Sequence, residues 1–410
     1  MKIKDKVRSA ILSRTTNDQR VGIELESIIY TNNNQRLSVN QCDYFTATDL
    51  LNILNDNKDE NGLHSLEPGG QLEWSSPAFF DLNDLQNSLS LYRALLDSVL
   101  LDKELKLIDY GLDPIFSPEQ VELINQKKYI LMDKHMGESG TMGKWMMRST
   151  ASIQINLDST CDKNMEEIAF ISDCLNPVAS YLFANCPYKE NKKTGRQNIR
   201  QVIWDKTDNM RCRNLFDHGI YQSSGLIDKY IDYVLSVPSI FKLDRSGKIL
   251  ESEVKVGERL VNLSSRGEIS ERDIQAGLHQ IFTNVRLKGL VEIRGADRTP
   301  VGYEIAPAAF WIGLLFDEKT REKVNGHLSQ WSTKDRKLFN RCASELNLDQ
   351  EGPQGKPYGD WIYIFSDYAI EGLVNRELGE EKLFQEFYNC IIEHGPFSLK
   401  VQSDESTHYS

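Results

Sequence analysis

The chain has 410 residues, 40% of them hydrophobic and 26% charged, which is an ordinary composition for a globular protein with a sizeable core. Its formal net charge of -12 at pH 7 argues against binding to the phosphate backbone of nucleic acids. No run approaches the roughly 20 apolar residues that cross a bilayer, and the N-terminus lacks the apolar segment of a signal peptide. We therefore expect a cytoplasmic protein without a membrane partner.

The predicted elements alternate between strands and helices along the chain. A strand at residues 21–30 is followed by an exposed loop at 56–62 and a strand at 69–76. An apolar stripe over 85–99 predicts a helix, and the capping sequence at 117–120 predicts the start of another. A strand at 148–158 precedes two predicted helices, 165–183 with Pro177 as a kink or break, and 274–287. The last predicted strand spans 290–297.

This pattern predicts the α+β class, with one mixed or antiparallel sheet and helices packed outside it, because long helical segments separate the strands. We expect a single catalytic domain over residues 1–400 and a disordered tail over 401–410. The seven cysteines are scattered without a CxxC pair, which favours reduced thiols over a structural zinc site.

Each predicted strand carries its polar residues on one face. Glu24 and Glu26, for example, are two residues apart and therefore leave the strand on the side opposite Ile23 and Leu25. If the apolar faces share one core, the polar faces form one concave surface. That surface would carry Glu24, Glu26, Glu73, Arg148, Gln154, Glu292 and Arg294.

Carboxylates gathered on one sheet face repel one another unless cations neutralise them, and oxygen ligands suit Mg²⁺ or Mn²⁺. Arginines between them would bind phosphate or carboxylate groups, so the set is typical of phosphoryl transfer. Any one of these Glu-x-Glu pairs is more often solvated surface, and only their joint occurrence favours a site. The sequence has no P-loop, no GxGxxG and no HExxH motif.

Seven segments, in this order, resemble the glutamate–cysteine ligases of the plant and bacterial second type, which include actinobacterial enzymes of ergothioneine synthesis. The segments are VGIELE, LEPGGQLEWSS, GLDP, MMRSTASIQINLD, LFANCPYKENKKTGRQNIRQVIWDKTD, VRLKGLVEIRGAD and FWIGLLFD. The resemblance implies a curved, mainly antiparallel sheet that forms a funnel with helices outside, as in glutamine synthetase and the guanido kinases. It also implies ATP, Mg²⁺ (with Mn²⁺ as a possible substitute) and small-molecule substrates.

The resemblance further implies roles for individual residues. The residues similar to metal ligands of the family are Glu24, Glu26, Glu73, Glu292 and, as a weaker candidate, Glu67. Gln154 resembles a polar partner of the metal or phosphate, and Arg294 resembles the phosphate-facing arginine. Arg148 and Arg200 resemble the arginines that hold glutamate, with Trp204 one helical turn from Arg200.

The implied reaction is the ATP-dependent ligation of the glutamate γ-carboxylate to the amine of cysteine through a γ-glutamyl phosphate. Two alternatives stay open at this point: the same chemistry with another amine, as in a natural-product pathway, and a catalytically idle relative that binds nucleotide. Leu25 stands where the plant enzymes have a lysine, and no cysteine pair corresponds to their regulatory disulfides.

Overall fold

The computed structural model describes residues 2–16, 18–57 and 62–403. The expected loop at 56–62 and the expected tail at 401–410 therefore lie largely outside the described residues. The described start of that tail is not irregular, because residues 401–403 close the last helix. No helix in these ranges is both long and apolar enough to cross a membrane. Every cysteine lies in the described ranges and is a free thiol.

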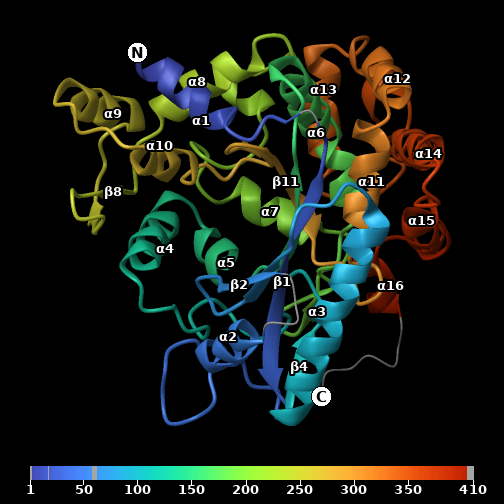
Figure 1. Ribbon diagram of the computed structural model, residues 1–410. Helices are drawn as coiled ribbons and strands as arrows, with labels where there is room; N and C mark the ends of the chain where they lie inside the picture. The colour runs from blue at the N-terminus through green and yellow to red at the C-terminus, as the bar shows by residue number, and fades with distance from the viewer. Residues whose placement is uncertain (1, 17, 58–61, 404–410) are drawn as a thin grey trace.

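A seven-stranded antiparallel sheet forms the centre of the described chain (Figure 1). Its strands are β1 (Val21–Thr31), β2 (Leu63–Leu66), β3 (Leu72–Ser75), β4 (Leu105–Ile108), β5 (Ser152–Leu157), β10 (Val285–Leu287) and β11 (Val291–Asp297). The order is β10-β11-β5-β1-β3-β2, and β4 pairs with the far end of β1. The sheet is open. Two two-stranded ribbons lie outside it, β6 (Tyr188–Lys189) with β7 (Lys192–Lys193) and β8 (Phe241–Leu243) with β9 (Ile249–Glu251).

Helices surround the sheet (Figure 1). They are α1 (Ile3–Ile11), α2 (Ala47–Asp56), α3 (Leu82–Asp102), α4 (Lys127–Ser139), α5 (Gly143–Arg148), α6 (Asp162–Leu182), α7 (Ile199–Asp205), α8 (Leu226–Ser236), α9 (Val256–Ser265), α10 (Glu271–Leu278), α11 (Ala306–Leu315), α12 (Glu318–Leu328), α13 (Thr333–Cys342), α14 (Tyr358–Asn375), α15 (Lys382–His394) and α16 (Phe397–Ser403). Two short 3₁₀ helices lie at Phe216–His218 and Pro353–Gly355.

The apolar face of the sheet packs on α6 and α11. Ile23 and Leu25 of β1 and Ile153 and Ile155 of β5 are buried in one cluster with both helices. All ten residues of α11 are buried, which is typical of a helix enclosed on every side. The alternation of apolar and polar residues therefore predicted correctly which side of the sheet meets the core.

Two predicted helices are wrong in part. The segment at 117–120 is a turn that no helix directly follows. Gln120 accepts from the Ser117 N–H as a capping box predicts, but Glu122 accepts the backbone N–H groups of residues 39 and 40. The predicted helix 274–287 ends at Leu278, and its last three residues are β10. The predicted helix 165–183 is confirmed as α6, which continues through Pro177.

An irregularity in β11 sets the direction of the residues that follow it. Ile293 pairs with Ile155, whereas Ala296 pairs with Ile153, so β11 contains one residue more than its partner. Such a bulge bends a strand and changes where its side chains point. Gly295 occupies it, and an added Cβ there would lie 1.9 Å from Asn176 Oδ1 of α6. A side chain at this position would therefore require Asn176 to move, whereas Gly195 is an ordinary turn with open space around it.

Candidate active site

Three cavities lie on the polar face of the sheet and share lining residues. The inner cavity has a volume of about 60 Å³ and is lined by Arg200, Trp204 and three methionines, among others. The middle cavity, about 280 Å³, shares Glu26, Glu67 and Arg294 with it. The outer cavity, about 850 Å³, shares Glu24, His279 and Lys288 with the middle one. A path thus leads from a wide opening to a small closed end.

The acidic cluster, Glu26, Glu67 and Glu73, lines the middle cavity. Glu26 and Glu73 face one another across β1 and β3. Burial, together with the charge of a neighbouring carboxylate, raises the pKa of Glu26 and Glu67 to about 7 and that of Glu73 to about 8. These three side chains therefore lack the positive charge that would keep all of them ionised at neutral pH.

Gln154 connects the acidic cluster to an arginine. Its amide nitrogen donates to Glu26 at 2.9 Å, and its amide oxygen accepts a hydrogen bond from Arg294. The Ser152 N–H donates to the other oxygen of Glu26 at 2.8 Å. Asn156, the next polar residue of β5, donates to Glu24 at 3.0 Å. The polar face of β5 is therefore a row of groups that orient the carboxylates of β1.

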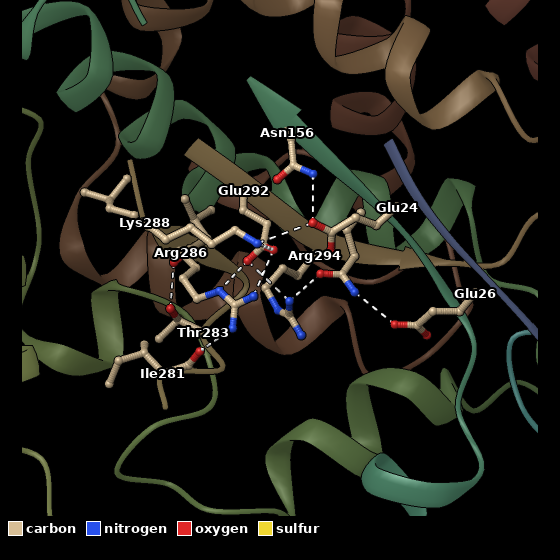
Figure 2. Close-up of polar contacts among 12 residues, drawn as sticks. Glu24, Glu26, Asn156, Ile281, Thr283, Arg286, Lys288, Glu292 and Arg294 are labelled. Atoms are coloured by element: carbon tan, nitrogen blue, oxygen red, sulfur yellow. Dashed lines mark hydrogen bonds and ion pairs between the residues drawn. The ribbon is translucent and has the colours of Figure 1, made fainter. Parts of the chain in front are cut away.

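The basic cluster, Arg286, Lys288 and Arg294, surrounds Glu292 (Figure 2). Both oxygens of Glu292 accept hydrogen bonds from Arg286, and the Lys288 ammonium lies 2.5 Å from one of them. Arg294 Nη1 lies 3.3 Å from the other. Glu292 is fully buried, and these cations hold its pKa well below the ordinary range despite the burial. One carboxylate thus organises three cations.

Arg200 and Trp204 form the closed end of the inner cavity. They lie one turn apart on α7, and the guanidinium carbon is 4.1 Å from the centre of the indole ring. Arg200 Nη2 donates to the backbone carbonyl of Arg294 at 2.8 Å, whereas its buried Nη1 has no hydrogen-bond partner and lies 3.9 Å from Asp297. A buried guanidinium with a free donor is suited to a carboxylate ligand.

Arg148 is not part of this site, which corrects its predicted place on the polar strand. The strand begins only at Ser152, and Arg148 is the last residue of α5. Its guanidinium binds both oxygens of Asp133, at 2.6 and 2.5 Å, and donates to two backbone carbonyls. Arg148 thus joins α4 to α5 and is not among the residues that line the three cavities.

The family of the chain is shown by comparison with known proteins. Residues 20–351 match glutamate-cysteine ligase family 2. The chain belongs to this family.

Relatives in this family include plant proteins. The chain is 30% identical over 320 residues to glutamate–cysteine ligase A, chloroplastic, of Oryza sativa subsp. indica, a match that covers 77% of this chain and 65% of the relative. It is 30% identical over 340 residues to the chloroplastic glutamate–cysteine ligase of Nicotiana tabacum, covering 80% and 63%. The chain thus spans less than two thirds of the length of these relatives.

A solved structure has a similar fold. The crystal structure of glutamate–cysteine ligase from Francisella tularensis in complex with AMP has a TM-score of 0.54, with 12% sequence identity. The match covers 94% of this chain and 86% of that one. The likeness extends over nearly the whole chain and shows a shared fold.

The carboxylates of the acidic cluster are the candidates for a metal site. In the described ranges, no three His, Cys, Asp or Glu side chains are grouped closely enough to hold a metal. The donor set nevertheless fits a divalent cation, because the acidic cluster offers only oxygen ligands and its pKa values are raised by burial and by the charge of the neighbouring carboxylates. Glu292 differs from that cluster, since cations already engage both of its oxygens.

Three cations of the site were missed in the sequence. Arg286 and Lys288 fell inside the predicted helix 274–287 and directly after it, and the alternation of Val285 and Leu287 with these two residues was the available signal of a strand. Lys128, near the start of α4, lines the middle cavity with the acidic cluster. No periodic pattern marks Lys128, because its position depends on how α4 packs.

Proposed function

We propose that the protein is an ATP-dependent carboxylate–amine ligase that joins the glutamate γ-carboxylate to the amine of cysteine, giving γ-glutamylcysteine, ADP and phosphate. The observation that carries the proposal is the sequence of three cavities, which leads from a wide opening past a basic cluster to a closed end at Arg200. Membership of the family, and the names of its plant members, favour glutamate and cysteine as substrates. We further propose that the sheet forms the funnel of the glutamine-synthetase and guanido-kinase type.

The proposed roles follow from the chemistry of each cavity. Arg200, stacked on Trp204, binds the α-carboxylate of glutamate with its unpartnered Nη1. The basic cluster holds the phosphate groups of ATP, whose charge it complements. The acidic cluster and Glu24 would hold Mg²⁺, which neutralises phosphate charge when bound. The nucleoside would occupy the outer cavity, and the complex with AMP of the Francisella protein is consistent with a nucleotide-binding fold.

In the proposed reaction, an oxygen of the glutamate γ-carboxylate attacks the γ-phosphorus of ATP and ADP leaves. The amine of cysteine then attacks the acyl phosphate, and the C–O bond to phosphate breaks while phosphate accepts the amine proton. The inner cavity, the smallest of the three, would limit access of water to the acyl phosphate, which would otherwise hydrolyse. A free carboxylate is too poor an electrophile for this attack, so activation must come first.

The test uses glutamate labelled with oxygen-18 in its γ-carboxylate. With Mg²⁺, ATP and cysteine, one labelled oxygen should appear in the phosphate that is released with ADP. Release of AMP and pyrophosphate would contradict the proposed mechanism, and unlabelled phosphate would indicate simple hydrolysis of ATP. A panel of other amines, analysed by product mass, identifies the acceptor. If no amine stimulates ADP release, the protein is an idle relative.

A further inference from the structure

Lys288 lies where the middle and outer cavities meet. Glu24, His279 and Lys288 are the residues that line both. Lys288 follows β10 in the short turn to β11, in which its N–H donates to the Leu290 carbonyl at 3.1 Å. Gly289 of this turn has φ +97 and packs against Ser13 after α1, which fixes the backbone of the turn. A phosphate chain that entered the middle cavity from the outer one would have to pass the Lys288 ammonium.

The Lys288 ammonium binds two carboxylates from different strands. Its Nζ lies 3.3 Å from Glu24 Oε1 on β1 and 2.5 Å from Glu292 Oε1 on β11 (Figure 2). Two carboxylate oxygens that converge on one cation are the arrangement that a divalent cation also uses. The Lys288 ammonium therefore sits between carboxylate oxygens of two neighbouring segments of the site, Glu24 and Glu292.

Glu292 does not require Lys288 for neutralisation. Arg286 alone binds both oxygens of Glu292, and Arg294 adds a third contact. The basic cluster therefore carries two more positive charges than Glu292 can balance. The lysine is also the group best suited to move, because its ammonium ends a flexible stem with four carbons, whereas the Arg286 guanidinium is fixed by its paired hydrogen bonds.

We propose that Lys288 has two positions: it bridges Glu24 and Glu292 when no nucleotide is bound, and it turns to the phosphate oxygens when a nucleotide enters with its divalent cation. This inference rests on the proposed function, because it assumes a nucleotide with a metal ion as ligand. The ammonium and the metal ion compete for the Glu24 carboxylate, whereas the ammonium and the phosphates attract each other. Lys288 thus opposes binding of the metal alone and favours binding of the metal with nucleotide.

A lysine that only stabilises the turn would behave differently. Its removal would disturb Glu24 and Glu292 and weaken the binding of metal and of nucleotide together. The two-position proposal requires opposite changes, because loss of the ammonium removes a competitor of the metal and a partner of the phosphates. The direction of the two changes therefore separates the proposals.

The experiment compares Lys288→Met with the wild type in two binding measurements. Mn²⁺ without nucleotide is titrated by electron paramagnetic resonance, and ADP at saturating Mg²⁺ is titrated by calorimetry. We expect Lys288→Met to weaken ADP binding about tenfold or more, the effect of losing a charge-assisted hydrogen bond. We expect it to tighten Mn²⁺ binding about threefold, because one positive charge beside the ion is gone.

Two further variants complete the design. Lys134→Met is the matched control, since Lys134 pairs with Glu251 at 2.9 Å on the surface, and removal of this pair should change neither titration. Lys288→Arg keeps the positive charge, on which both the competition with the metal ion and the attraction to phosphate depend, and should leave both affinities within about threefold of the wild type. It also keeps the proposal testable if Lys288→Met does not fold, because a change above tenfold in either titration would contradict it.

Opposite changes in Lys288→Met support the proposal. Unchanged ADP binding, unchanged Mn²⁺ binding or weakening of both overturns it, and so does a wild type that binds no ADP with Mg²⁺. Neither titration depends on turnover, so a protein that binds nucleotide but releases no ADP from ATP with glutamate and cysteine would contradict the proposed function and not the role of Lys288.

Discussion

The acidic and basic clusters both line the middle cavity, but their charges are balanced in opposite ways. The acidic cluster contains three carboxylates whose pKa values are raised to about 7 or 8. The basic cluster contains three cations around one carboxylate whose pKa is depressed. The first therefore lacks positive charge and the second lacks negative charge. The comparison shows that the cavity is complementary to a ligand that brings both, such as a polyphosphate with its metal ion.

The largest effect should come from removing the single carboxylate of the basic cluster. Glu292→Gln removes the fully buried carboxylate that three cations share and, among the described residues, leaves only Lys288 with a second carboxylate, that of Glu24. Loss of one partner from a buried ion pair costs about 3 kcal/mol, so the unfolding free energy should fall by about this amount. Urea unfolding measures it, and an unchanged midpoint would show that Glu292 does not hold the cluster together.

A second variant tests whether Arg200, in the inner cavity, binds its ligand independently of the acidic and basic clusters. Arg200→Ala should raise the KM for glutamate about 30-fold or more, because a buried carboxylate loses a charged partner worth about 2 kcal/mol or more. The KM for ATP should change much less. Steady-state kinetics with each substrate varied in turn measures both constants. If the ATP constant changes more, Arg200 belongs to the nucleotide site and the assignment of the inner cavity is wrong.

A third variant tests the acidic cluster, and the sign of its effect on stability should be opposite to that of Glu292→Gln. Since burial and Glu26 raise the pKa of Glu67 from 4.5 to about 7, its ionisation costs stability as pH rises between these values. Glu67→Gln removes that cost. Without metal, it should therefore increase the unfolding free energy at pH 8, by up to about 3 kcal/mol for this shift, and change it little at pH 4.5.

Added Mg²⁺ provides the internal control for this variant. The ion should raise the melting temperature of the wild type more at pH 8 than at pH 6, because protons compete for the same carboxylates. The rise should be smaller in Glu67→Gln. Destabilisation by Glu67→Gln at pH 8 in the absence of metal would contradict the view that the acidic cluster lacks positive charge.

The polar face of the sheet could be predicted from the sequence because a strand has a strict two-residue period. That period alone placed Glu24, Gln154 and Arg294 on the side away from the core, and all three line the cavities. It failed for Arg148, since alternation within a sequence does not show where a strand begins. The preceding helix α5 includes this residue, and the alternation continues into the helix by chance.

The segment 274–287 shows a second limit of the sequence. Ile274 and Leu278 have helical spacing, whereas Val285 and Leu287 have strand spacing, and no glycine or proline separates the two patterns after Leu278. The strand forms because β11 supplies a partner for it. A sequence window over 274–287 does not contain that partner. Two of the three cations of the basic cluster depend on that contact, one in β10 and one directly after it.

The hydrogen bond from Arg200 to the backbone carbonyl of Arg294 limits what a substitution at position 294 can change. The Arg294 N–H donates to the Asn284 carbonyl, but the Asn284 N–H donates to the Arg213 carbonyl and not back to Arg294. The Arg294 carbonyl is therefore available to Arg200. The acceptor is main chain, so no exchange of the side chain at position 294 removes it. A substitution at position 294 would therefore change the basic cluster while the hydrogen bond that holds Arg200 stays in place.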